Sequence, residues 1–157
     1  MKNQTFTYLA IFSVMVSMST TLWANEIVGT WKAMNDKTGA HEANVEIYQN
    51  KNGKYDGKIE KILALPNGAP QKFEKCVHCS GDLKNQPIIG LQILSNFIKN
   101  PKNSNEYING TVVDPESGKT YKGTIRLSSN GRKITLNGYV GISLLGRTQT
   151  WIKIKEE

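Results

Sequence analysis

The feature that most limits the fold is a repeated alternation of polar and apolar residues, in short segments separated by turn-forming clusters. Residues 54–60 (KYDGKIE) and 120–128 (TYKGTIRLS) show it most clearly, since every second residue is apolar or glycine. Successive side chains of a strand point to opposite faces, so this period predicts strands with one buried and one solvated face. Clusters of Asn, Asp, Ser and Gly, which favour tight turns, lie between the segments at 35–39, 50–53, 114–118 and 128–131.

Eight segments are predicted to be strands, at residues 27–34, 43–49, 54–62, 89–97, 106–113, 119–128, 132–140 and 147–154. The tight turns between most of them favour consecutive antiparallel pairing. Eight such strands can close into a barrel without exposed edges, which encloses either packed side chains or one small ligand. We therefore expect an all-β, eight-stranded antiparallel up-and-down barrel with one long loop between strands 3 and 4. A two-sheet sandwich is the alternative.

The phase of the alternation predicts which residues face the interior. In the seventh segment these are Ile134, Leu136, Gly138 and Val140. Glycines also occur inside the predicted strands, at positions 57, 110, 123 and 138. Glycine permits the sharp bending that a small barrel needs, so we expect these positions to mark bends.

Residues 1–24 have the organisation of a secretory signal peptide. Lys2 supplies a positive charge, residues 6–16 form an apolar run, and Ala24 is small enough to precede the cleavage site. The run is too short for a membrane-spanning helix, and no cysteine precedes Cys76 that could be the lipid-modified cysteine of a bacterial lipoprotein. Since the whole chain has 157 residues, we expect residues 25–157 to form one domain that is periplasmic or secreted.

Residues 63–88 form one long connection with three of the five prolines and both cysteines, Cys76 and Cys79. A structural disulfide between these two is the interpretation we favour, because an exported compartment is oxidising. Haem attachment would need a histidine directly after the second cysteine, where Ser80 stands. A thioredoxin-like redox pair would need a following helix, which Pro87 opposes, and zinc would need one of only two histidines. Reversible thiol–disulfide exchange at the same pair stays an alternative.

The sequence lacks the patterns of common catalytic sites. It has two histidines, no Gly-x-Ser-x-Gly motif and no phosphate-binding loop, and its carboxylates are scattered among turns and solvated faces. The formal net charge of +7 is spread over alternate strand positions and forms no stripe with interleaved aromatic residues, which argues against nucleic-acid binding. We expect no enzymatic activity, no cofactor and no bound metal.

The ends of the predicted barrel contain two tryptophans and an arginine. Gly29-Thr30-Trp31 opens the first strand, and Arg147 opens the last, four residues before Trp151. In a closed barrel these strands are neighbours, so Arg147 could stack over an indole and seal one end, or both tryptophans could be core residues. Tyrosine hydroxyls could add polar groups to an apolar interior. The candidate ligand-binding residues are Trp31, Tyr55, Tyr121, Tyr139, Arg147 and Trp151.

Three longer segments, at 76–91 (CVHCSGDLKNQPIIGL), 114–121 (DPESGKTY) and 138–151 (GYVGISLLGRTQTW), carry a family resemblance. Together they resemble the DUF2147 group of exported bacterial proteins, whose function is unassigned. The resemblance implies a lipocalin-like or calycin-like barrel and supplies no catalytic residues. Gly29-Thr30-Trp31 and Arg147 resemble the opening motif and closing arginine of lipocalins. Asp82 and Lys84 are charged residues of the loop motif.

These observations lead to three functional hypotheses. The first is an exported barrel that binds a small apolar or amphipathic molecule without catalysis. The second is an envelope interaction or stress protein that contacts a protein partner through the Cys76–Cys79 loop and Lys84. The third is a thiol–disulfide redox protein that uses the same cysteine pair.

Overall fold

The structure is a computed structural model that describes residues 26–64, 67–69, 74–141 and 146–155. The predicted signal peptide, residues 1–24, lies outside the described residues. The strands are β1 (Gly29–Met34), β2 (His41–Gln49), β3 (Tyr55–Ile62), β4 (Gln92–Asn100), β5 (Asn103–Val113), β6 (Thr120–Leu127), β7 (Lys133–Tyr139) and β8 (Arg147–Lys153), with a short 3₁₀ helix, η1 (Gly81–Leu83), before β4.

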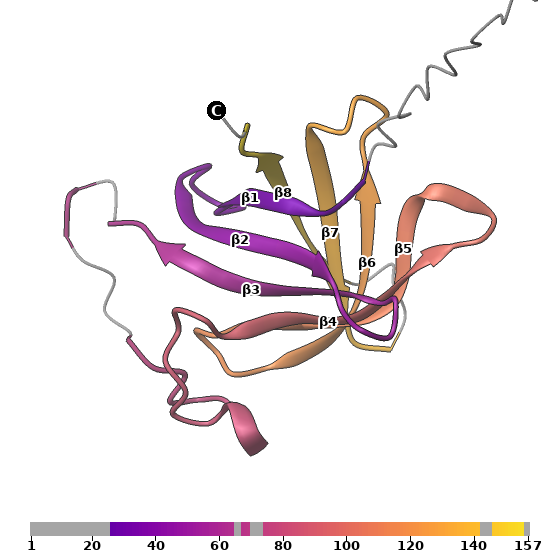
Figure 1. The fold of residues 1–157 in the computed structure, drawn as a ribbon. Coiled ribbons are helices and arrows are strands. Elements are labelled where there is room, and N and C mark those ends of the chain that lie inside the picture. Colours follow the sequence, from indigo (N-terminus) through magenta and orange to yellow (C-terminus); the bar gives the residue numbers. More distant parts are fainter. Residues whose placement is uncertain (1–25, 65–66, 70–73, 142–145, 156–157) are drawn as a thin grey trace, which may run out of the picture.

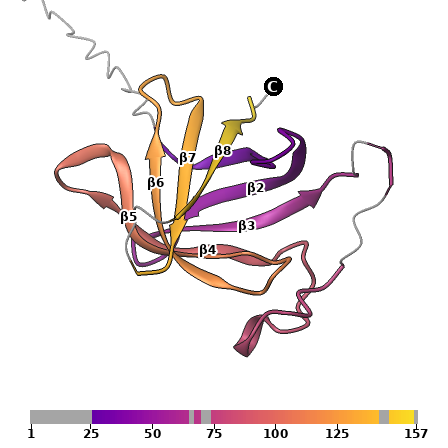
Figure 2. The same ribbon diagram turned by 180° about the vertical axis from the view of Figure 1, so that it is seen from behind.

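Each strand pairs antiparallel with the next, and β8 pairs with β1, so the sheet closes into the predicted eight-stranded up-and-down barrel (Figures 1 and 2). This closure excludes the sandwich. All eight predicted segments are strands, and the largest differences are at β4 and β5. Residues 89–91 belong to the loop before β4, where Gly90 has a φ of 88°, and residues 98–100 and 103–105 extend a tight β4–β5 hairpin.

The two ends of the barrel differ, and we name them by how they are covered. At the closed end lie the β2–β3, β4–β5 and β6–β7 turns and the chain before β1. There Ile27 and Trp31 are fully buried, and the Trp31 indole donates a hydrogen bond to the Ile27 carbonyl at 2.8 Å. Lys153 donates to the Glu26 carbonyl, with its ammonium 5.3 Å from the centre of the Trp31 ring. Residues 26–28, the described chain before β1, therefore cover this end of the barrel together with Trp31.

At the open end lie the β1–β2 and β5–β6 turns, the β7–β8 connection and the long connection of residues 63–91. This connection leaves the barrel at the end of β3, on the left of Figure 1, and returns to β4. We call its described part from residue 74 to residue 91 the disulfide loop. Its chain is held by the bridge between Lys75 and Pro87 and by a hydrogen bond from the Ile88 amide to the Glu74 carbonyl.

The closed half of the barrel is filled by large side chains. Phe97 and Tyr107 are fully buried, and the Tyr55 and Tyr107 rings meet edge to face at 4.8 Å between centroids. Burial raises the pKa of Tyr107 to about 12, so its phenol stays neutral. These aromatic side chains leave no room for a ligand in this half.

Three of the strand glycines leave space for large side chains, a role that we did not expect. A Cβ at Gly110 would lie 2.3 Å from the Phe97 ring, and one at Gly123 would lie 2.6 Å from it. A Cβ at Gly57 would lie 2.9 Å from the Leu94 side chain. Register shifts lie at Gly57 and next to Gly110, and the neighbouring Asn96 and Asn109 have φ near 60°.

The phase of the alternation is correct for most of β7 and wrong at its end. Ile134 and Leu136 are buried as predicted. Val140 is 72% exposed, because β7 ends at Tyr139 and the chain turns away from the barrel at Gly141, which has a φ of 76°. The two-residue alternation of a strand therefore ends with β7 at Tyr139 and does not predict the burial of Val140.

Replacing Gly110 with alanine should lower the free energy of unfolding by about 1–3 kcal/mol, because the added methyl group overlaps the Phe97 ring. Urea denaturation measures this change. Gly138→Ala is the matched control, since a Cβ there would lie at an ordinary contact distance of 3.5 Å from Tyr121. The control should change the free energy by less than about 1 kcal/mol. A Gly110→Ala protein as stable as the wild type would contradict the packing described here.

Candidate functional site

A cavity of about 340 Å³ occupies the open half of the barrel. Its walls are mostly apolar and come from β1–β8 together with the disulfide loop. The apolar lining residues are Ala33, Ala43, Val45, Ile59, Ile62, Ile88, Ile93, Val112, Val113, Pro115, Tyr121, Leu136, Gly138 and Trp151. The polar ones are Asn35, Glu42, Asp114, Glu116, Arg147 and Gln149.

Three small residues of the open half help to leave the cavity unfilled. Ala33 and Ala43 are directly paired across β1 and β2, and Gly138 on β7 also lines the cavity. The corresponding interior positions in the closed half hold Trp31 and Phe97. A barrel of eight strands has just enough interior for side chains to fill, so small residues at one end leave a chamber there.

One polar lining residue, Arg147, forms an ion pair at the rim with Asp36, which is not itself a lining residue. The Arg147 guanidinium donates from Nε to Asp36 Oδ2 at 2.7 Å, and its Nη2 donates to Asp36 Oδ1. This bidentate pair joins the start of β8 to the β1–β2 turn. The hydrogen bond from Arg147 lowers the pKa of Asp36 below its usual value, and the same bond raises the pKa of Arg147.

Three carboxylates line the cavity. Glu42, at the start of β2, accepts a hydrogen bond from the Asn35 amide at 2.6 Å. Asp114 accepts from the Glu116 amide at 3.0 Å and from the Ser117 hydroxyl at 2.8 Å, which holds the β5–β6 turn. Glu42 and Asp114 each act on Arg147 through their charge and raise its pKa further. The rim therefore has an excess of acidic groups.

The disulfide loop forms one wall of the cavity mouth. Cys76 and Cys79 are bonded to each other, and both are buried. Cys76 Sγ lies 3.4 Å from the Pro115 carbonyl oxygen. A Cβ at Gly118 would lie 1.9 Å from the His78 carbonyl oxygen, so only glycine allows this approach. The loop thus packs on the β5–β6 turn, with Ile88 directed to the cavity.

The structure brings together half of the residues that we predicted to bind a ligand. Tyr121, Arg147 and Trp151 line the cavity. Trp31 and Tyr55 are buried in the filled half, and Tyr139 is partly buried but does not line the cavity. Of the six predicted residues, the three that line the cavity thus all lie in the open half of the barrel.

Of the two alternatives for Trp31, Trp151 and Arg147, the structure shows both tryptophans buried in the core and no stacking of Arg147 on an indole among the described contacts. The guanidinium pairs with Asp36 at the open end, whereas the cation over Trp31 is Lys153 at the closed end. The two positions differ because β8 runs the whole height of the barrel, so its first and last residues lie at opposite ends.

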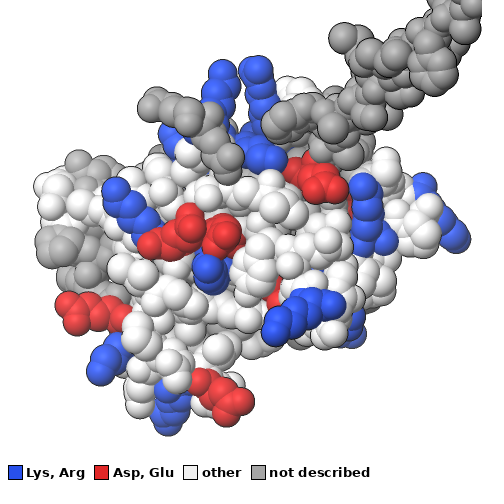
Figure 3. Space-filling view, viewed as in Figure 1, with Lys and Arg blue, Asp and Glu red and all other residues white. Residues whose placement is uncertain are grey.

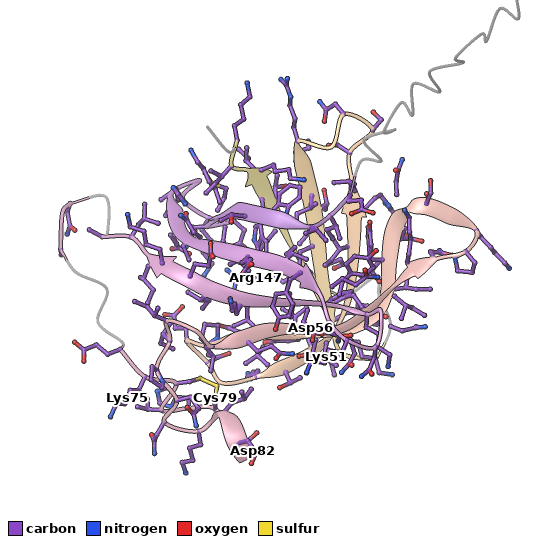
Figure 4. The ribbon with its side chains drawn as sticks, viewed as in Figure 1. Lys51, Asp56, Lys75, Cys79, Asp82 and Arg147 are labelled. Atoms are coloured by element: carbon purple, nitrogen blue, oxygen red, sulfur yellow. A yellow bond between two sulfur atoms is a disulfide. The ribbon has the colours of Figure 1, made fainter. Side chains whose placement is uncertain are left out.

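The two charged residues of the loop motif lie away from the cavity. Asp82 and Lys84 are exposed, and Figure 4 shows Asp82 at the outer tip of the disulfide loop, far from Arg147. The bond at Cys79 is closer to the barrel (Figure 4).

Sequence reasoning missed Asp36, Glu42, Asp114 and Glu116 as rim residues. Three of them belong to turns or flank them, where solvated carboxylates are common. The only available signal was that Asp36, Asp114 and Glu116 belong to turns that a consecutive barrel places at one end. Glu42 lies in β2, where only the register shows that it points to the cavity.

The described residues show no other obvious site. No group of three or more His, Cys, Asp and Glu side chains among them could hold a metal ion. Within the same residues, no helix is long and apolar enough to cross a membrane. On the face in Figure 3, the Lys and Arg side chains are spread out, with Asp and Glu side chains between some of them.

A closed eight-stranded barrel with one plugged end and one cavity at the other has the architecture of lipocalins. Protein HP1028 from the human pathogen Helicobacter pylori, which belongs to the lipocalin family, has a similar solved structure, with a TM-score of 0.68 and 22% sequence identity over 83% of this chain and 84% of that chain. At that identity the likeness shows the fold alone. No curated protein matches the sequence.

The chain belongs to the family described as "Uncharacterized protein conserved in bacteria (DUF2147)", which matches residues 29–153. The match covers the whole barrel and confirms the resemblance that the sequence motifs indicated.

Replacing Asp36 with asparagine should lower stability by about 1 kcal/mol or less, because the ion pair is partly exposed. The pKa of Asp36 is lowered in the folded protein, so its contribution is present above the unfolded-state pKa of about 3.9 and is lost as the pH falls through the folded-state value. Urea denaturation of both proteins from pH 7 to pH 2 measures it. High salt should reduce the difference at pH 7. An equal difference at pH 7 and pH 2 would contradict a charge-based contribution.

Replacing both Cys76 and Cys79 with serine should lower the free energy of unfolding by about 2 kcal/mol in the loop-closure model. Residues 76–79 of the disulfide loop pack on Pro115 and Gly118. Loss of the disulfide should therefore also shift the amide NMR signals of the β5–β6 turn. Signals of the β2–β3 turn at the closed end serve as the internal control. Shifts of equal size at both ends would indicate a general loosening of the barrel.

Proposed function

We propose that this protein binds one small apolar or amphipathic molecule in the open half of its barrel, without catalysis. The observation that carries the proposal is the apolar cavity of about 340 Å³ with its polar groups confined to a few positions. Ligand sites in proteins have this composition, in which apolar walls supply affinity and a few polar groups fix orientation.

The volume limits the size of the ligand. It lies at the lower end of the roughly 300–1,000 Å³ range of ligand pockets. It is about twice the ~150 Å³ cavity that accommodates benzene. The buried part of the ligand therefore has on the order of a dozen non-hydrogen atoms. Each methylene that enters contributes about 0.8 kcal/mol, so even a short chain binds measurably.

The chemistry of the lining supports binding over catalysis. The described lining residues include no Ser, Thr, Cys, His or Lys, so the carboxylates and Tyr121 have no such partner in the lining for acid–base or nucleophilic chemistry. The one guanidinium is paired with a carboxylate, and Asp114 accepts two hydrogen bonds. These groups suit the positioning of a bound molecule.

An exported location is part of the proposal. The organisation of residues 1–24 supports it, and so does the Cys76–Cys79 bond, since disulfides persist in oxidising compartments. The burial of both sulfurs supports a structural bond over thiol exchange, because an attacking thiolate must reach one of them.

Isothermal titration with 1-octanol tests the binding hypothesis, and the fluorescence of Trp151, which lines the cavity, gives a second readout. We expect saturable binding with a stoichiometry near one. Ala43→Phe fills the mouth and should weaken binding by at least about tenfold, the equivalent of about two buried methylenes. Ala64→Phe makes the same change at an exposed position after β3 and is the matched control. Equal binding by both variants, or no binding by the wild type, would refute the proposal.

A second candidate function is contact with a protein partner through the disulfide loop. It is supported by two large apolar side chains on that loop, Val77 and Ile89, which are 53% and 61% exposed. A Val77→Ser/Ile89→Ser variant should then lose a partner that copurifies with the wild type from the natural host. Retention of that partner by the variant would count against this surface.

A further inference from the structure

We propose that the cavity selects a cationic amphiphile, an amine whose apolar body enters the barrel and whose ammonium group stays at the rim. This inference rests on the proposed binding function and names the class of ligand for the same cavity. It depends on which charges at the rim are already neutralised and which are not.

The one cation among the described lining residues, Arg147, already holds a carboxylate of the protein itself. Arg147 donates two hydrogen bonds to Asp36 in a bidentate pair, the geometry in which a guanidinium recognises a carboxylate most strongly. A fatty-acid carboxylate would have to displace Asp36, whose pKa is lowered by that same pair. The protein's own carboxylate therefore occupies the position that an anionic head group would need.

The ionisable acids of the lining are Glu42, Asp114 and Glu116. None of the three lies in an ion pair with a Lys, Arg or His side chain of the described residues. The described lining residues therefore carry three carboxylates and one guanidinium, a formal charge of −2, while Asp36 pairs with Arg147 from outside the lining and has Lys37 beside it. The chain as a whole has a formal charge of +7, so the sign at the rim is opposite to that of the protein.

The placement of these acids suits a cation at the centre of the mouth. Glu42 stands on β2, and Asp114 and Glu116 stand on the β5–β6 turn, three strands further around the closed barrel. An ammonium group between them has three donors for carboxylate oxygens on two sides. The aromatic side chains Tyr121 and Trp151 in the same cavity also favour a cation over an anion.

The apolar chamber beneath the acids is what makes them part of a site. Carboxylates on a surface are usually solvated, but these border walls formed by Ile59, Leu136 and Trp151. A ligand that fills the chamber brings its polar end to the rim. Glu42 and Asp114 are only partly exposed, and a charge-assisted hydrogen bond is stronger at such a position than on an open surface.

Three probes with the same eight-carbon chain test the inference, namely octylamine, 1-octanol and octanoate, titrated into the wild-type protein at pH 7. We expect octylamine to bind about tenfold more tightly than 1-octanol, and octanoate to bind most weakly. If 1-octanol binds and octylamine binds no more tightly, the inference fails and the binding function stands. If none of the three binds, the binding function itself fails.

Variants test whether the rim acids cause the selectivity. Glu42→Gln and Glu116→Gln should each lower the ratio of octylamine to 1-octanol affinity several-fold, and the double variant should lower it further. Glu60→Gln removes the same charge from the outer face of β3 and is the matched control, with an unchanged ratio. Asp36→Asn releases Arg147 and should strengthen octanoate binding several-fold. An unchanged ratio in the double variant would overturn the inference, because the preference would then arise elsewhere.

Discussion

The pairing of β1 with β8 is the constraint on which the rest of this structure depends. It closes the sheet, and it places Trp31 opposite Lys153 and Ala33 opposite Trp151 along one seam. The first pair lies at the closed end, where the indole, the ammonium and the N-terminal segment form the plug. The second pair lies in the open half, where alanine leaves room beside the other tryptophan. One seam therefore contributes to both the plug and the chamber.

The size of the inward side chains divides the interior into two halves. Phe97 fits into the closed half because Gly110 and Gly123 have no side chain beneath its ring. Its own strand is shifted in register at Asn96, whose amide donates to Asp56 at 2.7 Å. In the open half, Ala33 on β1 and Ala43 on β2 have small side chains, and the space beside them stays unfilled. The cavity and the filled core are thus two outcomes of one alternation, which differ only in side-chain volume.

The rim combines this chamber with an unusual distribution of charge. The chain has a formal net charge of +7, but Asp36 pairs with the one arginine among the described lining residues. The disulfide loop closes one side of the mouth through its contact with the β5–β6 turn, which also carries two of the acids. The loop and these two acids therefore depend on the same turn, so a change in that turn affects the mouth of the cavity.

The sequence by itself determined the number of strands, their order, the inward phase of most of them and the pairing of the cysteines, because these depend on neighbouring residues and on the two-residue period. It also indicated Tyr121, Arg147 and Trp151. Only the tertiary structure decided that Arg147 pairs with Asp36, 111 positions away in the chain, and that Glu42 faces the cavity. Barrel closure brings such residues together, and the height at which each one lies depends on strand stagger and bulges that local patterns do not encode.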